Sequence, residues 1–103
     1  MLRKLQEEQL PWAKHNFGTD RPSWWPLLGA VEEIGELAHA HLKAAQGIRT
    51  SEDHFANKKD AVADVIIYLS DYRLIEGVDL QSVVEETWDM VKQRDWKKNP
   101  VAG

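Results

Sequence analysis

Three glutamates stand close together in the sequence Glu32-Glu33-Ile34-Gly35-Glu36. In a helix, at about 100° per residue, Glu32 and Glu36 lie about 40° apart and Glu33 lies about 60° from Glu36. All three side chains therefore project from one side of a helix within about one turn. Such a stripe is also common on solvated helix faces, so this motif alone does not specify chemistry.

A second acidic position makes a binding site the stronger interpretation. The segment 61–69 is apolar almost all round, with Asp64 in its middle, and this pattern predicts a buried helix. A buried carboxylate without a partner is very costly, so Asp64 requires a cation. Asp60 and Asp71 fall on the same helix face, and no lysine or arginine stands three or four residues from Asp64. The cation is then either a metal ion or a basic side chain from another helix.

Carboxylates from two helices favour a hard cation, because Mg²⁺ prefers oxygen ligands and Mn²⁺ can replace it. The expected ligands are Glu32, Glu33, Glu36 and Asp64, with Asp60 beside them. A di-iron bundle is the rival, since Glu36 and His39 form a Glu-x-x-His pattern, but that site needs the pattern on two helices. His39 and His41 are therefore predicted to be packing or surface residues. The chain has no cysteine, which excludes thiolate ligands and disulfides.

Four helices are expected to position these residues in a single all-α, four-helix bundle-like domain over residues 1–103. Pro11 should kink or split the first helix, Ser23 and Asp79 are expected N-caps, and Gly47 and Gly77 are expected helix ends. The predicted ranges are 2–16, 24–46, 55–76 and 80–96.

Composition narrows the class of protein. The net charge of −4 disfavours a nucleic-acid binder, which would present a basic face. No apolar run approaches the roughly 20 residues that span a bilayer, so no membrane partner is expected. The N-terminal residues lack the apolar core of a secretory signal, which predicts a cytoplasmic location.

Segments 28–40 and 59–69 together resemble the MazG-like family, within the all-α nucleoside triphosphate pyrophosphohydrolases. The family signature is Glu-Glu-x-x-Glu on one helix and Glu-x-x-Asp on the next. Glu32, Glu33 and Glu36 match the first part and Asp64 the end of the second, whereas Ala61 replaces the remaining glutamate. Asp60, one residue earlier, resembles a variant of short phage- and integron-cassette-type members. The resemblance covers roughly residues 10 to 99.

The resemblance implies Mg²⁺-dependent hydrolysis of (deoxy)nucleoside triphosphates to a nucleoside monophosphate and pyrophosphate, as house-cleaning of the nucleotide pool. The metal would neutralise the triphosphate and orient it for in-line attack. The nucleophile is a metal-bound water or one deprotonated by Glu33, with Glu36 as the other candidate catalytic residue. Candidate substrate-binding residues are Lys43, Lys59 and Arg94 for phosphate, Trp25 for stacking on a base, and Asp71.

Two alternatives remain open, one within the enzyme class and one in a different class of function. A related dUTPase, dCTPase or phosphoribosyl-ATP pyrophosphohydrolase would share the fold and the metal. A non-catalytic helical interaction module would explain the net acidic charge, but it would not explain why Asp64 stands in the middle of an apolar helix. The five tryptophans exceed what so small a bundle would bury, which predicts a homodimer or a dimer of dimers.

Overall fold

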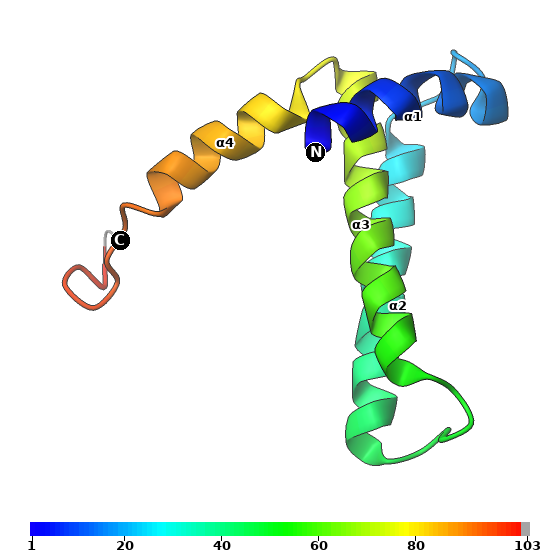
Figure 1. Ribbon diagram of the computed structural model, residues 1–103, viewed down its shortest axis with the longest axis vertical. Coiled ribbons are helices and arrows are strands. Elements are labelled where there is room, and N and C mark those ends of the chain that lie inside the picture. The colour runs from blue at the N-terminus through cyan, green and yellow to red at the C-terminus, as the bar shows by residue number, and fades with distance from the viewer. Residues whose placement is uncertain (102–103) are drawn as a thin grey trace.

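The computed structural model describes residues 1–101 of the chain and contains four helices. They are α1 (Leu2–Phe17), α2 (Trp24–Gln46), α3 (His54–Glu76) and α4 (Leu80–Val91). No strand occurs among these described residues, so the predicted all-α, four-helix domain is confirmed. Helices α2 and α3 form a long antiparallel hairpin, α1 lies across one end of it, and α4 projects away (Figure 1).

Most helix ends follow from local chemistry. Gly47 and Gly77 end α2 and α3 in the left-handed conformation, with φ of 68° and 76°, which glycine adopts without steric cost. Asp53 caps α3, because its carboxylate accepts a hydrogen bond of 3.0 Å from the Ala56 amide. Ser23 occupies the N-cap position of α2, as predicted, but its side chain makes no capping hydrogen bond.

Two helix features differ from the prediction. Pro11 was expected to kink or split α1, and it does not split it: the helix continues to Phe17 and tolerates the loss of the one backbone hydrogen bond that proline cannot donate. Helix α4 ends at Val91 rather than near Trp96. Beyond it, the Asp95 carboxylate accepts hydrogen bonds of 3.1 Å from the amides of Lys97 and Lys98. This local turn competes with a continued helix.

Small residues allow α2 and α3 to pack closely. Ala30, Ala40 and Ala61 are buried in the hairpin. At Gly29, a Cβ atom would overlap Cε1 of Tyr68, so the Tyr68 ring occupies the space that a side chain would need. The close approach of the two helices fixes the separation of the acidic groups that they carry.

Polar contacts attach α1 to the hairpin. The Gln9 amide nitrogen donates to the Ile67 carbonyl at 2.9 Å, and the Ser70 hydroxyl donates to the Gln9 side-chain oxygen at 2.6 Å. After α1, Arg21 forms a two-pronged ion pair with Asp71 of α3. These contacts place the aromatic residues of α1 over α3.

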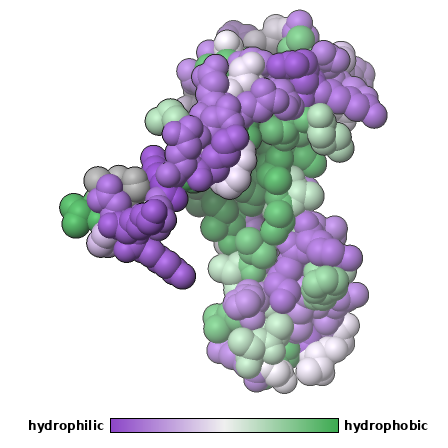
Figure 2. Space-filling view, turned by 60° about the vertical axis from the view of Figure 1, so that its left-hand side comes forward, coloured by the Kyte–Doolittle hydropathy of each residue, from purple (hydrophilic) through white to green (hydrophobic). Residues whose placement is uncertain are grey.

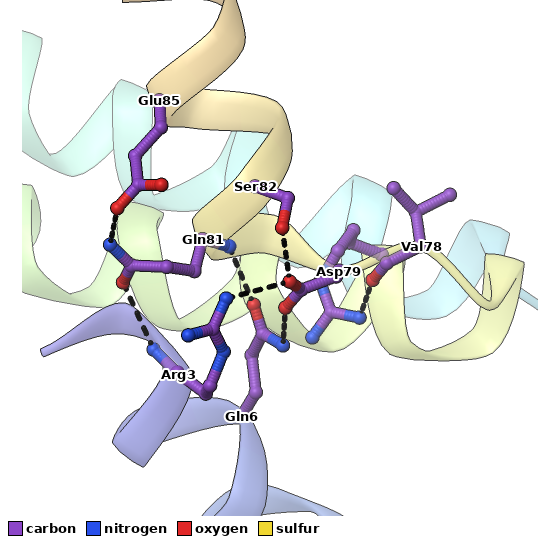
Figure 3. Close-up of polar contacts among 8 residues, drawn as sticks. Arg3, Gln6, Val78, Asp79, Gln81, Ser82 and Glu85 are labelled. Atoms are coloured by element: carbon purple, nitrogen blue, oxygen red, sulfur yellow. Dashed lines mark hydrogen bonds and ion pairs between the residues drawn. The ribbon is translucent and has the colours of Figure 1, made fainter.

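Among residues 1–101, the hydrogen bonds that tie α4 to α1 all lie at its first turn. Asp79 accepts hydrogen bonds from Ser82, Gln6 and Arg3, at 2.6, 2.7 and 3.1 Å, and the Gln6 side chain accepts one from the Gln81 amide (Figure 3). We call these five residues the Asp79 clamp. No residue of α4 is buried. The clamp thus joins α4 to α1 and directs it away from the hairpin.

None of the helices over residues 1–101 has a stretch long and apolar enough to cross a bilayer.

Candidate active site between α2 and α3

An acidic cleft of about 370 Å³ lies between α2 and α3, near the lower end of the roughly 300–1,000 Å³ typical of ligand pockets. Four of the five predicted metal ligands line this acidic cleft: Glu33, Glu36, Asp60 and Asp64. Glu32 does not line it and is exposed. The two helices therefore bring together carboxylates that are about 30 residues apart in the chain.

The carboxylates of the acidic cleft repel one another. The pKa of Glu33 is raised by partial burial and by the nearby charges of Asp64, Glu36 and Glu32. Within residues 1–101, no ion pair within 4.0 Å includes any of the five predicted ligands. Asp64 is only partly buried in the single chain, not fully buried as expected, and the alternative of a structural ion pair finds no basic partner there.

The donor chemistry of the acidic cleft fits a hard divalent cation, since carboxylate oxygens line it without a neutralising lysine or arginine. In the described chain, no three histidine or acidic side chains stand close enough to enclose an ion. Binding would therefore require their side chains to turn inward. An exposed glutamate on a helix surface can turn inward by changing its side-chain rotamer, without a change in the backbone conformation.

An aromatic pocket of about 230 Å³ adjoins the acidic cleft and shares Glu33 and Asp64 with it. Its other lining residues are Gln9, Trp12, Phe17, Ile67, Tyr68 and Asp71. Trp12 and Phe17 meet edge to face, with ring centroids 5.7 Å apart. A planar apolar group in the aromatic pocket would thus lie beside an anionic group held in the acidic cleft.

The fold fixes this aromatic pocket from two sides. The Tyr68 ring lies against Gly29, and the Arg21 guanidinium lies 5.6 Å from the centroid of the Phe17 ring. Asp71, a predicted substrate-binding residue, lines the aromatic pocket while its carboxylate pairs with Arg21. Asp71 therefore lines the aromatic pocket and, through Arg21, also helps to position the Phe17 ring in its wall.

The other predicted substrate-binding residues do not line the acidic cleft or the aromatic pocket. Trp25 packs edge to face with Trp24, and Lys43 donates to Gln46 at 3.3 Å. Lys59 lies over the Phe55 ring, 4.9 Å from its centroid. Arg94 follows α4, which projects away from the hairpin (Figure 1).

Sequence reasoning missed several lining residues. His39, predicted to be a packing or surface residue, lines the acidic cleft, and so does Asn57. Asn57 stands three and seven residues before Asp60 and Asp64, a spacing that places all three on one helix face and could have revealed it. Trp12 and Phe17 carry no such signal, because only the tertiary fold brings α1 onto α3.

Comparison with known proteins gives no match to a family model, a curated protein or a solved structure.

Proposed function

We propose that the protein is a Mg²⁺-dependent nucleoside triphosphate pyrophosphohydrolase, as the resemblance of segments 28–40 and 59–69 to MazG-like enzymes implies. The observation that carries this proposal is the acidic cleft, where Glu33, Glu36, Asp60 and Asp64 meet from two helices without a basic partner within the described chain. Four clustered carboxylates repel an anionic substrate unless a cation joins them. A complex of Mg²⁺ with a nucleotide supplies the cation that the carboxylates bind and the phosphate anion that the cation neutralises.

The adjoining aromatic pocket supports a nucleotide as the substrate. Trp12, Phe17 and Tyr68 provide aromatic faces on which any nucleobase can stack, and Gln9 and Asp71 provide polar groups at the same wall. The triphosphate would extend into the acidic cleft, because Glu33 and Asp64 line both spaces. Stacking alone does not select one base, so this arrangement suits a broad set of nucleotides.

In this proposal Glu33, Glu36 and Asp64 hold the cation, with Asp60 in place of the glutamate absent at Ala61. The bound Mg²⁺ would neutralise the phosphates and orient them. The attacking water would be activated by the metal or deprotonated by Glu33, whose carboxylate lines the acidic cleft. The water oxygen would bond to the α-phosphorus as the bond between the α-phosphorus and the bridging oxygen breaks, and pyrophosphate would leave with the electron pair of the broken bond.

The test is pyrophosphate release from a panel of standard and modified NTPs and dNTPs, in Mg²⁺ and in EDTA. We expect release that requires the metal, and loss of at least about 100-fold in kcat in Glu36→Gln, as for groups that stabilise transition-state charge. Glu7→Gln changes an exposed α1 glutamate outside the acidic cleft and serves as the matched control. No release from any nucleotide would favour the alternative, a non-catalytic interaction module.

A further inference from the structure

The two ends of the acidic cleft differ in chemistry. At one end, Glu33 and Asp64 are shared with the aromatic pocket. At the other end, the cleft is lined by the imidazole of His39 on α2 and the side-chain amide of Asn57 on α3, in place of carboxylates. We call His39 and Asn57 the donor pair. Nothing in the proposed mechanism uses either residue.

The antiparallel hairpin fixes the order of the groups along the cleft. His39 stands six residues after Glu33 on α2, and Asn57 stands seven residues before Asp64 on α3. At a rise of about 1.5 Å per residue, these separations are about 9–11 Å along the hairpin. Because the helices are antiparallel, both displacements run away from α1 and toward the α2–α3 connection (Figure 1). The order is therefore aromatic pocket, carboxylates, donor pair.

The hairpin is polar toward the end where the donor pair lies. On the face seen in Figure 2, hydrophilic side chains gather at the end that carries the α2–α3 connection, and hydrophobic ones over the middle. His39 is half-buried and Asn57 is exposed. This end of the cleft therefore suits a strongly hydrated, charged part of a ligand better than an apolar one.

The donors of the pair are not used within the fold. None of the side-chain hydrogen bonds within residues 1–101 includes His39 or Asn57. An imidazole offers an N–H donor even when it is neutral, and an amide nitrogen offers two. Both side chains can thus donate to a ligand in the cleft from opposite sides, one from each helix.

A nucleoside triphosphate presents its groups in the same order as the cleft. With the base in the aromatic pocket, the chain of phosphates runs along the carboxylates and their cation and ends near the donor pair. A carboxylate at that end would repel the terminal phosphate, whereas N–H groups form charge-assisted hydrogen bonds with its oxygens. A nucleoside diphosphate is one phosphate shorter and does not reach as far.

We propose that His39 and Asn57 bind the terminal phosphates of the substrate and so select nucleoside triphosphates over diphosphates. The inference rests on the proposed function for the direction in which the nucleotide lies. The same donor pair would hold the pyrophosphate group as it leaves. Both residues act by hydrogen bonding to the phosphate oxygens and neither is a ligand of the cation.

Kinetics of a triphosphate and of the matching diphosphate test the selection. His39→Ala and Asn57→Ala should each lower kcat/KM for the triphosphate at least about tenfold, as the loss of a hydrogen bond to a charged group does. The value for the diphosphate, or its inhibition constant where it is not cleaved, should not change. His39→Gln keeps an N–H donor and should recover most of the loss. Equal losses for both nucleotides, or a His39→Gln protein as impaired as His39→Ala, would overturn the proposal.

The charge at the donor pair gives a second kinetic comparison. Asn57→Asp keeps the shape of the side chain but replaces a donor with a negative charge, so it should impair triphosphate turnover more than Asn57→Ala. The matched controls are His41→Ala on the exposed side of α2 and Gln93→Glu beyond α4, since neither residue lines the cleft. Both controls should match the wild type. An Asn57→Asp protein no worse than Asn57→Ala would contradict phosphate binding at this end.

Calorimetry with inorganic pyrophosphate in Mg²⁺ tests the donor pair without turnover. The dissociation constant should rise at least about tenfold in His39→Ala and in Asn57→Ala, while the affinity for Mn²⁺ alone stays unchanged. A wild type that binds no pyrophosphate, or a loss of Mn²⁺ affinity in His39→Ala, would overturn the proposal. Pyrophosphate binding through the pair without hydrolysis of any nucleotide would uphold the donor pair and reject the proposed function. Nucleotide hydrolysis with unaffected variants would do the reverse.

Discussion

Arg21 and Asp71 form a buried, two-pronged ion pair that joins the segment before α2 to the last third of α3. The two terminal guanidinium nitrogens each donate to one carboxylate oxygen, and the side chains are only 8% and 7% exposed. The hydrogen bonds from Arg21 to Asp71 raise the pKa of the arginine further above its ordinary value. The pair holds α1 and the aromatic pocket against the hairpin.

Removing one member of this pair should destabilise the protein strongly. Asp71→Asn leaves the Arg21 charge buried without its partner, which costs about 3–5 kcal/mol. Glu8→Gln removes the exposed pair with Lys4, whose side chains are about 70% exposed, and should cost less than about 1 kcal/mol. Urea unfolding at equal protein concentration measures both changes. Similar losses in the two variants would contradict the structural role of Asp71.

Asp64→Asn, the same substitution about two helical turns earlier on α3, should have the opposite effect on stability. Asp64 has no ion-pair partner in the described chain and lies near the like charge of Glu33. In EDTA, the free energy of unfolding should rise or stay level, because a repulsive charge is removed. With Mg²⁺, the proposed turnover should collapse. A loss of several kcal/mol in EDTA would show that Asp64 serves a structural ion pair, supplied by another chain.

Two glycines of α2 give a matched pair of alanine substitutions. At Gly35, a Cβ atom meets nothing within 4 Å, so Gly35→Ala should stabilise the helix by about 0.5–1 kcal/mol. At Gly29, the added methyl would strike the Tyr68 ring. Gly29→Ala should therefore destabilise the protein by about 1–3 kcal/mol, as overpacking does. It should also displace a wall of the aromatic pocket.

Thermal unfolding followed by circular dichroism separates the two glycine variants. Under the proposed function, Gly29→Ala should also raise KM more than it lowers kcat, because Tyr68 lines the aromatic pocket and not the centre of the acidic cleft. If both variants shift the melting temperature in the same direction, the close approach of Gly29 and Tyr68 is not a constraint on packing.

The Asp79 clamp should make stability depend on pH in the acid range. Hydrogen bonds from Ser82, Gln6 and Arg3 hold the pKa of Asp79 well below its ordinary value of about 4. The unfolded chain then binds the proton more readily, so the clamp stabilises the fold above about pH 4 and loses this contribution as the pH falls below it. Asp79→Asn should be less stable at pH 7 and should lose less stability on acidification.

Chemical denaturation at a series of pH values between about 2 and 7 tests the clamp. The curves for the wild type and Asp79→Asn should converge at the acid end. Asp20→Asn, at an exposed loop aspartate, is the matched control and should run parallel to the wild type. A constant difference between Asp79→Asn and the wild type at every pH would show that Asp79 acts through its shape and not its charge.

Local patterns predicted the parts of the fold that depend on neighbouring residues. The left-handed glycines Gly47 and Gly77 end their helices as expected, and the spacing of Glu33, Glu36 and Asp64 places them at one acidic cleft. The end of α4 was missed because the Asp95 side chain competes for backbone amides, a contact that hydrophobic periodicity does not register.

The long-range features could not be read from the sequence. The Arg21–Asp71 pair spans 50 residues and has no periodic signature. The apolar character of α3 predicted burial, yet Val62 and Ile66 are 49% and 45% exposed within one chain. Hydrophobic periodicity identifies the apolar face of a helix, but it does not show whether the same chain covers that face.

The direction of α4 has a consequence for how the protein folds. The hairpin forms from contacts near in sequence and should assemble within about a millisecond, as helical proteins do. Helix α4 joins α1 through hydrogen bonds between residues 73 and 76 positions apart in the chain, so its docking should follow the formation of the hairpin. A chain under synthesis can therefore complete the hairpin before Asp79 has been made, and α4 is the last helix to find its place.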